Sequence, residues 1–296
     1  MADLSTHPGN RRKRLRALMG GARPLLAPGA HDALSARLVE QAGFEAMYMG
    51  GFATTASLLG RPDIGLLGAA EMIDNARRIV QTVDLPVIAD ADTGYGNPIN
   101  VLRTVREYEQ AGVAAIHLED QVSPKRCGHF SGKSVVPVED MVAKLRAAVT
   151  ARADPDLVII ARTDALAIEG VDAAIARARR YAEAGADALW VEAPTTEAEI
   201  ERIAAALSGY AVVLNWAEGG RTPPIDIDRI RALGFALVLF PIGSVLALVA
   251  ALQDHLAYLR THGTPAGRLA KLPSFERFTE IVGLGEIRAL EQRFRS

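Results

Sequence analysis

Short apolar runs alternate with longer amphipathic stretches along most of this 296-residue chain. The runs are rich in Val, Ile and Ala and carry few polar interruptions, which is typical of strands buried on both faces of a parallel sheet. There are eight of them, at residues 25–30, 46–50, 86–92, 115–119, 157–163, 188–192, 211–215 and 236–241. The pattern therefore predicts eight parallel strands.

The stretches between the runs have the apolar spacing of helices. We expect helices over residues 69–82, 101–111, 138–150, 172–184, 196–207 and 227–233. Several stretches close on an Ala-Gly pair, as at Ala111-Gly112 and Ala184-Gly185. Glycine supplies the left-handed residue that commonly ends a helix, so these pairs mark the return to the next strand.

Eight strand–helix units in about 240 residues predict a (β/α)₈ TIM barrel. A doubly wound sheet is the alternative, but no glycine-rich loop opens a helix after the first strand. Beyond about Gly263 the pattern changes, and residues 274–293 predict one or two further helices. We therefore expect one barrel domain over residues 1–296, with a C-terminal helical extension over about 264–296.

Charge and composition argue against several classes of function. The net charge is −2 and aromatic residues make up 5%, with no basic stretch interleaved with aromatics. Nucleic acid and anionic membranes are therefore poor candidates as partners. No apolar run reaches the ~18 residues of a membrane span.

The N-terminus and the cysteine content suggest a cytoplasmic protein. The basic run at residues 11–14 is not followed by the apolar segment that a signal peptide needs. We expect this run to be a solvated first helical turn. A single cysteine, Cys127, excludes an internal disulfide and a Cys-based zinc cluster and fits a reducing compartment.

Carboxylates stand where two predicted strands end, which is where a barrel builds its active site. Asp90 and Asp92 close the third strand and Glu119 closes the fourth. Side chains alternate along a strand, so Asp90 and Asp92 are expected on one face. Buried carboxylates cost several kcal/mol unless a cation compensates them, and oxygen ligands suit Mg²⁺ or Mn²⁺. The alternative is a helix-capping aspartate beside a surface one.

The loop after the fourth strand carries Lys125-Arg126-Cys127-Gly128-His129. Neighbouring cations favour the thiolate form of a cysteine and suit it to proton transfer. The alternative is an inert buried cysteine, as most lone cysteines are. Gly128, with Gly132 further on, would let the loop move as a lid.

The sequence lacks the residues that two other kinds of enzyme would need. A Schiff-base aldolase requires a lysine inside the barrel, and no lysine falls on a predicted strand. A zinc enzyme requires clustered His or Cys, and the six histidines form no ligand-spaced pair. A metal-assisted reaction with oxygen ligands remains.

With these residues in view, the chain resembles the isocitrate lyase/phosphoenolpyruvate mutase superfamily over about residues 17–294. Four motifs carry the resemblance: DADTGYGN at 90–97, HLEDQVSPKRCGH at 117–129, IIARTDA at 159–165 and PGAHDALSA at 28–36. The KRCGH segment after LEDQ is the most specific of them.

The resemblance implies a TIM barrel whose C-terminal helix is swapped between subunits, assembled as a homotetramer (a dimer of dimers). It implies Mg²⁺ bound by Asp90 and Asp92, with Glu119 assisting through water. Arg162 would bind the substrate carboxylate, and Cys127 would be the acid/base residue of the lyase branch.

The same resemblance assigns the rest of the site. Tyr48 would lie at the 2-oxo acid end and take part in catalysis. The substrate-binding residues would be Gly50, Gly51, Gly128, His129, Glu192 and Asn215. The implied reaction is a retro-aldol cleavage of a 2-hydroxy dicarboxylate, which releases pyruvate or a related 2-oxo acid.

The chain departs from its apparent relatives at three positions. Gly50 replaces the serine that the lyases usually carry. Leu246 stands where methylisocitrate lyases place an arginine for a third carboxylate, which disfavours a tricarboxylate substrate. Pro241 stands where oxaloacetate hydrolases have serine, which makes that activity less favoured.

Three functions therefore remain. A carbon–carbon lyase acting on a substituted malate comes first, and a phosphonomutase that forms a C–P bond is the second. The third is a barrel that binds a 2-oxo acid without turnover, which Gly50 alone favours.

Overall fold

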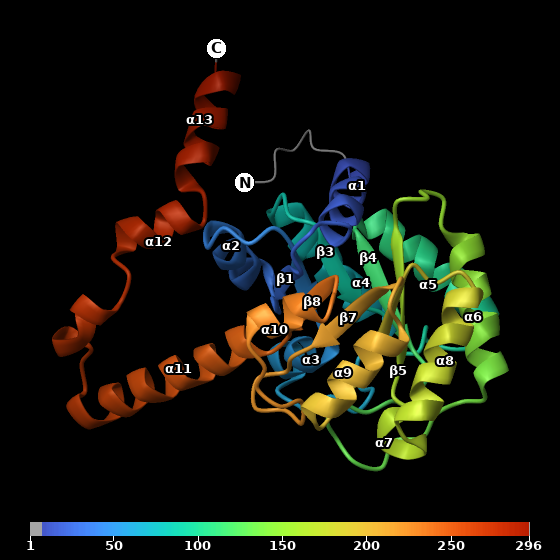
Figure 1. Cartoon of the computed structure of the whole chain (residues 1–296). Helices are drawn as coiled ribbons and strands as arrows, with labels where there is room; N and C mark the ends of the chain where they lie inside the picture. The colour runs from blue at the N-terminus through green and yellow to red at the C-terminus, as the bar shows by residue number, and fades with distance from the viewer. Residues whose placement is uncertain (1–7, 296) are drawn as a thin grey trace.

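A computed structural model describes residues 8–295, and its centre is a ring of parallel strands (Figure 1). The strands lie side by side in the order β1-β8-β7-β6-β5-β4-β3-β2. One parallel bridge between Gly29 and Tyr48 joins the two ends of this sheet. The strands are β1 Leu25–Pro28, β2 Met47–Met49, β3 Val87–Asp90, β4 Ala115–Glu119, β5 Val158–Thr163, β6 Ala188–Val191, β7 Ala211–Asn215 and β8 Leu237–Phe240. The predicted (β/α)₈ barrel is confirmed.

Helices surround the strands at nearly the predicted positions. Those that match predicted segments are α4 Ala69–Thr82, α5 Pro98–Ala111, α6 Val138–Ala151, α8 Val171–Glu183, α9 Glu197–Ala206 and α10 Ile227–Ala232. α5 begins three residues before its predicted start because Asn97 caps it and accepts hydrogen bonds from the Ile99 and Asn100 amides. Helices outside the predicted segments are α2 Ala33–Gln41, α3 Gly51–Leu59, α7 Leu166–Glu169 and α11 Gly243–His262.

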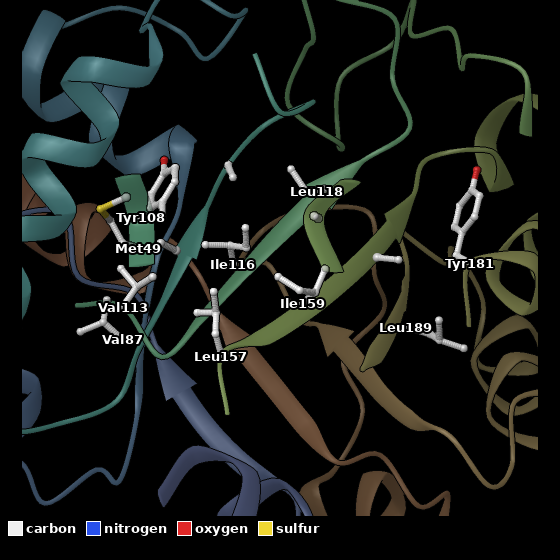
Figure 2. Packing of buried hydrophobic residues seen from close by; sticks show 14 of the residues in the cluster. Met49, Val87, Tyr108, Val113, Ile116, Leu118, Leu157, Ile159, Tyr181 and Leu189 are labelled. Carbon is white, nitrogen blue, oxygen red and sulfur yellow. The ribbon is translucent and has the colours of Figure 1, made fainter. Parts of the chain in front are cut away.

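Side chains on the outer face of the strands form the larger core. Figure 2 shows Met49, Val87, Ile116, Ile159 and Leu189 in this layer, where they pack with apolar residues of the surrounding helices. Side chains alternate along each strand, so the residues between these positions point into the barrel. Both faces are buried, which explains the nearly unbroken apolar runs.

The inner face of the strands changes character along its length. At the amino ends of the strands, the barrel interior is filled by apolar residues such as Ala115, Val158 and Ala188. Following the same inward register toward the carboxyl ends leads to His117 and Glu119 on β4, and to Arg162 on β5. The alternation of side chains therefore places polar residues inside the barrel at the carboxyl ends of the strands.

Helix α1 (Pro8–Met19) closes the barrel at the amino ends of the strands, and its basic run is solvated only in part: Lys13 and Arg14 are exposed as predicted, whereas the first two arginines are not. Arg11 and Arg12 are buried, and Leu15 packs against the strand interior. Arg12 donates to the carbonyl of Val113 at 3.0 Å and to Asp154 at 2.9 Å. For Arg11 and Arg12 the prediction was wrong, because carbonyl and carboxylate acceptors that are remote in sequence bind their guanidinium groups.

The C-terminal segment forms an arm that leaves the barrel (Figure 1). Helix α11 runs outward, and the chain continues through η1 (Ala266–Lys271), α12 (Phe275–Ile281) and α13 (Leu284–Phe294). The arm returns to the barrel near α2, where Arg37 and Gln41 donate to the Ile281 carbonyl. Much of its apolar surface is exposed, including 85% of Phe275. None of the helices between residues 8 and 295 has both the length and the hydropathy to span a bilayer.

Candidate active site

The predicted site residues meet around one cavity at the carboxyl ends of the strands. The cavity has a volume of about 190 Å³, below the roughly 300–1,000 Å³ of sites for drug-sized ligands. Of the predicted residues, those that line it are Tyr48, Gly50, Gly51, Asp90, Cys127, Gly128, His129, Arg162, Glu192 and Asn215. Asp92 and Glu119 do not line it directly. The cavity suits a small acid.

Asp90 and Asp92 reach a common cluster, but by a different route from the one predicted. Strand β3 ends at Asp90, and Asp92 has a left-handed φ of 48°, so the two residues do not share a strand face. Asp90 accepts hydrogen bonds from the amides of Gly51 at 2.8 Å and of Asp92 itself at 2.9 Å. The turn, rather than strand alternation, brings the second carboxylate into the cluster.

Lys125 lies among these carboxylates, together with one acid that sequence analysis did not assign to the site. Its Nζ atom is 2.7 Å from Asp63 Oδ2 and 2.8 Å from Asp92 Oδ1. Burial alone would lower the pKa of Lys125, but Asp92, Asp90 and Asp63 outweigh it and raise that pKa well above its usual value. Asp63 belongs to the loop after α3 and not to a strand end, so its position along the sequence does not mark it as a site residue.

One lysine does not balance three carboxylates. Burial, with Asp90 and Asp63 nearby, raises the pKa of Asp92 to about 7 despite the opposing effect of Lys125. Burial likewise raises the pKa of Glu119 well above its usual range, although Arg162 lies 3.3 Å away. The cations nearby thus do not fully compensate the burial of the Asp92 and Glu119 carboxyl groups.

The donor set fits a hard divalent cation. Asp92 Oδ1 and both carboxylate oxygens of Glu119 are buried without a hydrogen-bond partner of good geometry, even though Lys125 is close to Asp92. Between residues 8 and 295, no three His, Cys, Asp or Glu side chains form a ready metal cage. Mg²⁺ usually takes one or two carboxylates and completes its shell with water and substrate oxygens, so these oxygens suit it.

Arg162 is held in the cavity wall by a ring of acids. Its Nε atom donates to Asp164 at 2.9 Å, and its other nitrogens lie 3.3 Å from Glu119 and 3.5 Å from Glu192. The guanidinium also lies over the ring of Trp190, 4.7 Å from its centroid. These contacts fix one face of Arg162 and direct it at the cavity.

The surroundings of Cys127 favour its thiol form, contrary to the predicted thiolate. Burial raises its pKa to about 11, although a backbone hydrogen bond from His129 opposes the shift. The neighbouring cations do not help, because Lys125 is committed to the Asp cluster and Arg126 is exposed. A group in this state is suited to giving a proton rather than to nucleophilic attack.

The loop that carries Cys127 is folded down over the cavity. The Cys127 amide donates to the Asp63 carbonyl at 3.0 Å, and His129 Nδ1 accepts from the Arg221 amide at 2.9 Å. Gly128 lies so close to Glu192 and Arg162 that a Cβ atom there would overlap both. Glycine at this position is therefore required for the loop to close.

The absence of a side chain at Gly50 also has a steric explanation. A Cβ atom at this position would lie 2.6 Å from Cε1 of Tyr48. The Tyr48 ring is buried, and its hydroxyl group is hydrogen-bonded to His117 Nε2 at 2.8 Å. A serine at position 50 would displace this ring, so Gly50 and the placement of Tyr48 belong together.

Comparison with known proteins gives consistent matches over the whole barrel. The family model described as phosphoenolpyruvate phosphomutase matches residues 15–260. The chain is 45% identical to the 2,3-dimethylmalate lyase of Eubacterium barkeri, over 96% of this chain and 98% of that protein. It is 41% identical to probable 2-methylisocitrate lyase 1 of Corynebacterium glutamicum, over 96% and 93% respectively.

Solved structures agree with the sequence matches. An oxaloacetate acetylhydrolase in complex with 3,3-difluorooxalacetate superposes with a TM-score of 0.92 at 37% identity, covering 98% of this chain and 99% of that one. A phosphonopyruvate hydrolase in complex with oxalate and Mg²⁺ superposes with a TM-score of 0.89 at 34% identity, covering 97% and 99%. The likeness extends through the C-terminal arm.

Proposed function

Since this chain belongs to the phosphoenolpyruvate phosphomutase family, we propose that it is a Mg²⁺-dependent carbon–carbon lyase. Its substrate is a substituted malate, and pyruvate or a related 2-oxo acid is one product. The observation that carries this proposal is the geometry of the cavity, which the half-buried Cys127 thiol lines together with Arg162 and Asp90.

The reaction needs three tasks to be done in that cavity. The substrate's hydroxyl group passes its proton to a carboxylate of the site, the C–C bond breaks so that one fragment becomes the 2-oxo acid, and the departing carbon gains a proton. Arg162 binds a substrate carboxylate and fixes its orientation, because bidentate pairing with carboxylates is what guanidinium groups do well. Cys127 delivers the proton to the departing carbon as a general acid.

Asp90 and Asp92 would hold the metal, with Glu119 acting through water. When bound, Mg²⁺ stabilises the negative charge that develops on the substrate oxygens, and Mn²⁺ is an acceptable substitute. Asp92 Oδ1 and the carboxylate oxygens of Glu119 support this assignment, because they accept no hydrogen bond of good geometry although cations lie nearby. Mg²⁺ is also present in the neighbouring phosphonopyruvate hydrolase structure.

The cavity favours a dicarboxylate over a tricarboxylate. Lys125 and Arg162 are the Lys and Arg side chains among its described lining residues, and both already contact acids. The remaining wall includes apolar side chains, namely Phe52, Phe130, Ala217, Pro241 and Ile242. Leu246, which replaces the arginine expected to bind a third carboxylate, lies on α11 and is 44% exposed. It is not part of the cavity lining. The size preference thus rests on the cavity itself.

The active unit is a homotetramer in which the arm of one subunit packs on another. Exposed apolar residues along α11 and α12, such as Leu252, Leu256 and Phe275, support this assembly. Surfaces of this kind mark interaction sites in natural proteins.

The test is a substrate screen with Mg²⁺. Substituted malates, including 2,3-dimethylmalate, are compared with methylisocitrate, oxaloacetate and phosphonopyruvate, while pyruvate release and ³¹P spectra are recorded together. We expect a dicarboxylate to exceed methylisocitrate by about a hundredfold in kcat/KM, because a buried unpaired carboxylate costs several kcal/mol. A preference for methylisocitrate would refute the size assignment. Turnover of phosphonopyruvate or oxaloacetate alone would refute the lyase.

A further inference from the structure

A second buried lysine, Lys133, lies beside the site, and the reaction described above gives it no task. Its side chain is 2% exposed. The chain returns toward the barrel at this point, since the Val122 amide donates to the Ser134 carbonyl at 2.9 Å. Lys133 is therefore placed at the base of the loop that covers the cavity. We call residues 125–130 of that loop the lid.

On one side, Lys133 contacts the acid that orients Arg162. Its Nζ atom lies 2.7 Å from Asp164 Oδ1. The same carboxylate accepts from Arg162 Nε at 2.9 Å and from another Arg162 nitrogen at 3.1 Å. Asp164 is fully buried, and the positive charges of Arg162 and Lys133 overcome its burial and lower its pKa. Lys133 is thus one of two cations that keep Asp164 ionised and in place.

On its other side, Lys133 donates a hydrogen bond to the carbonyl of Gly128 in the lid. Gly128 directly follows Cys127, and its backbone lies against Arg162 and Glu192. One ammonium group therefore joins the lid backbone, next to the thiol, to the carboxylate that orients the substrate-binding arginine. The lid has other described anchors, among them Lys125 on Asp63, the Cys127 amide on the Asp63 carbonyl and the Arg126 backbone on Gln121. His129 also contacts Glu192 and the Arg221 amide, and Phe130 contacts Phe52, but none of these contacts involves Asp164.

We infer that Lys133 is a positioning residue that couples closure of the lid to the orientation of Arg162. Closing the lid brings the Gly128 carbonyl to an ammonium that Asp164 already holds. Without Lys133, this carbonyl loses its donor, and Asp164 keeps Arg162 as its only described cationic side-chain partner. Both losses favour the open lid, since hydrogen bonds to charged groups are among the stronger ones in proteins. The catalytic consequence rests on the function proposed above, but the effect on the lid does not.

The lid has a built-in reporter, because Cys127 is the only cysteine in the chain. Its rate of alkylation by iodoacetamide, measured below the pKa of about 11, reports exposure of the lid thiol. We compare wild type with Lys133→Met, which keeps the chain length but removes the charge, and with Lys133→Arg, which retains a cation. Lys133→Gln enters the same comparison if the Met variant does not fold.

The matched control is Arg152→Met. Arg152 forms a partly buried ion pair with Asp187 near the amino ends of the strands, away from the cavity. We expect Lys133→Met to raise the alkylation rate on the order of 10- to 100-fold, with Lys133→Arg near wild type and Arg152→Met unchanged. Equal rates in wild type and Lys133→Met would overturn the inference. So would an equal acceleration in Arg152→Met, which would indicate general loosening.

Kinetics supply the second readout. On the best substrate from the screen, Lys133→Met should lose on the order of 10- to 100-fold in kcat/KM, with partial recovery in Lys133→Arg. Faster alkylation with unchanged kinetics would refute the coupling to Arg162. If the wild type cleaves none of the substrates, the proposed lyase fails, while the alkylation rates still decide whether Lys133 holds the lid.

Discussion

Burial is the largest cause of the pKa shifts of two groups in this site, Cys127 and Asp92. The pKa of Cys127 is raised to about 11 because its surroundings exclude water and the adjacent Lys125 pairs with Asp63 instead. Asp92 has its pKa raised to about 7 because burial and two other acids outweigh Lys125. The raised pKa of Cys127 suits a proton donor, and the raised pKa of Asp92 suits a site that binds a cation. Both can be tested with single substitutions.

Cys127→Ser should slow C–C cleavage by roughly 10²–10⁴-fold, the usual contribution of general acid catalysis. The hydroxyl is similar in size but a far weaker acid, so KM should change little. The measurement is kcat, with deuterium from the solvent followed into the released product. A phosphonomutase needs no proton at carbon and should lose less. Cleavage near the wild-type rate would show that Cys127 is not the acid.

Asp92→Asn should abolish turnover and leave the fold intact, because Asp92 serves the cation site rather than the core. EDTA should inactivate the wild type, and Mg²⁺ or Mn²⁺ should restore it. The control is Asp228→Asn, which changes an exposed acid on α10 and should have no effect on either rate or fold. Full activity after exhaustive chelation would refute the metal assignment.

Among the elements, strands and loops contribute differently to the site. Each strand delivers inward side chains in a fixed register, so Arg162 on β5 follows from strand alternation. The loops deliver groups that no register fixes, such as Asp63 after α3 and Lys125 after β4. Helix α1 contributes differently again, because it closes the opposite end of the barrel.

Arg12→Met in α1 should lower the free energy of unfolding by about 1–3 kcal/mol, since it leaves the Val113 carbonyl without this donor and Asp154 without this cation. Urea denaturation measures the change. Arg14→Met, on the exposed side of the same helix, is the matched control and should stay within about 0.5 kcal/mol. Equal stability of Arg12→Met and wild type would show that the contacts of Arg12 in α1 do not stabilise the barrel at the amino ends of its strands.

At the scale of the whole molecule, the arm is the part that the barrel does not explain. Helices α11 to α13 expose apolar side chains in succession rather than singly. An isolated subunit would present this surface to water, which natural proteins generally avoid. Contact with another copy of the chain would bury it.

Leu252→Glu combined with Leu256→Glu on α11 should therefore shift the protein from a tetramer to smaller species. A charge buried at an interface without a partner costs several kcal/mol. Light scattering after size exclusion gives the mass. The matched control is Ile99→Glu, which changes an apolar residue on α5 that is 70% exposed and should leave the mass unchanged. A monomeric wild type would contradict the proposed assembly.

The sequence by itself determined the barrel and most of the residues around its cavity. Strand periodicity and strand-end position are local properties, and they placed Asp90 and Glu119 at one rim. The family resemblance added Arg162, Glu192 and Asn215. The KRCGH motif added the lid. The limits of the single domain, the metal and the catalytic roles stay predictions.

Only the tertiary structure decided what depends on contacts between distant segments. Asp63 and Lys125 pair across 62 positions, and Arg12 reaches Asp154 across 142. Local patterns contain no information about such pairs, so Asp63 was missed, and Arg11 and Arg12 were wrongly expected in solvent. The proton on Cys127 has the same origin. A pKa depends on how much water and charge the folded chain leaves around a group, and the folded lid removes the water while Lys125 turns to the acids.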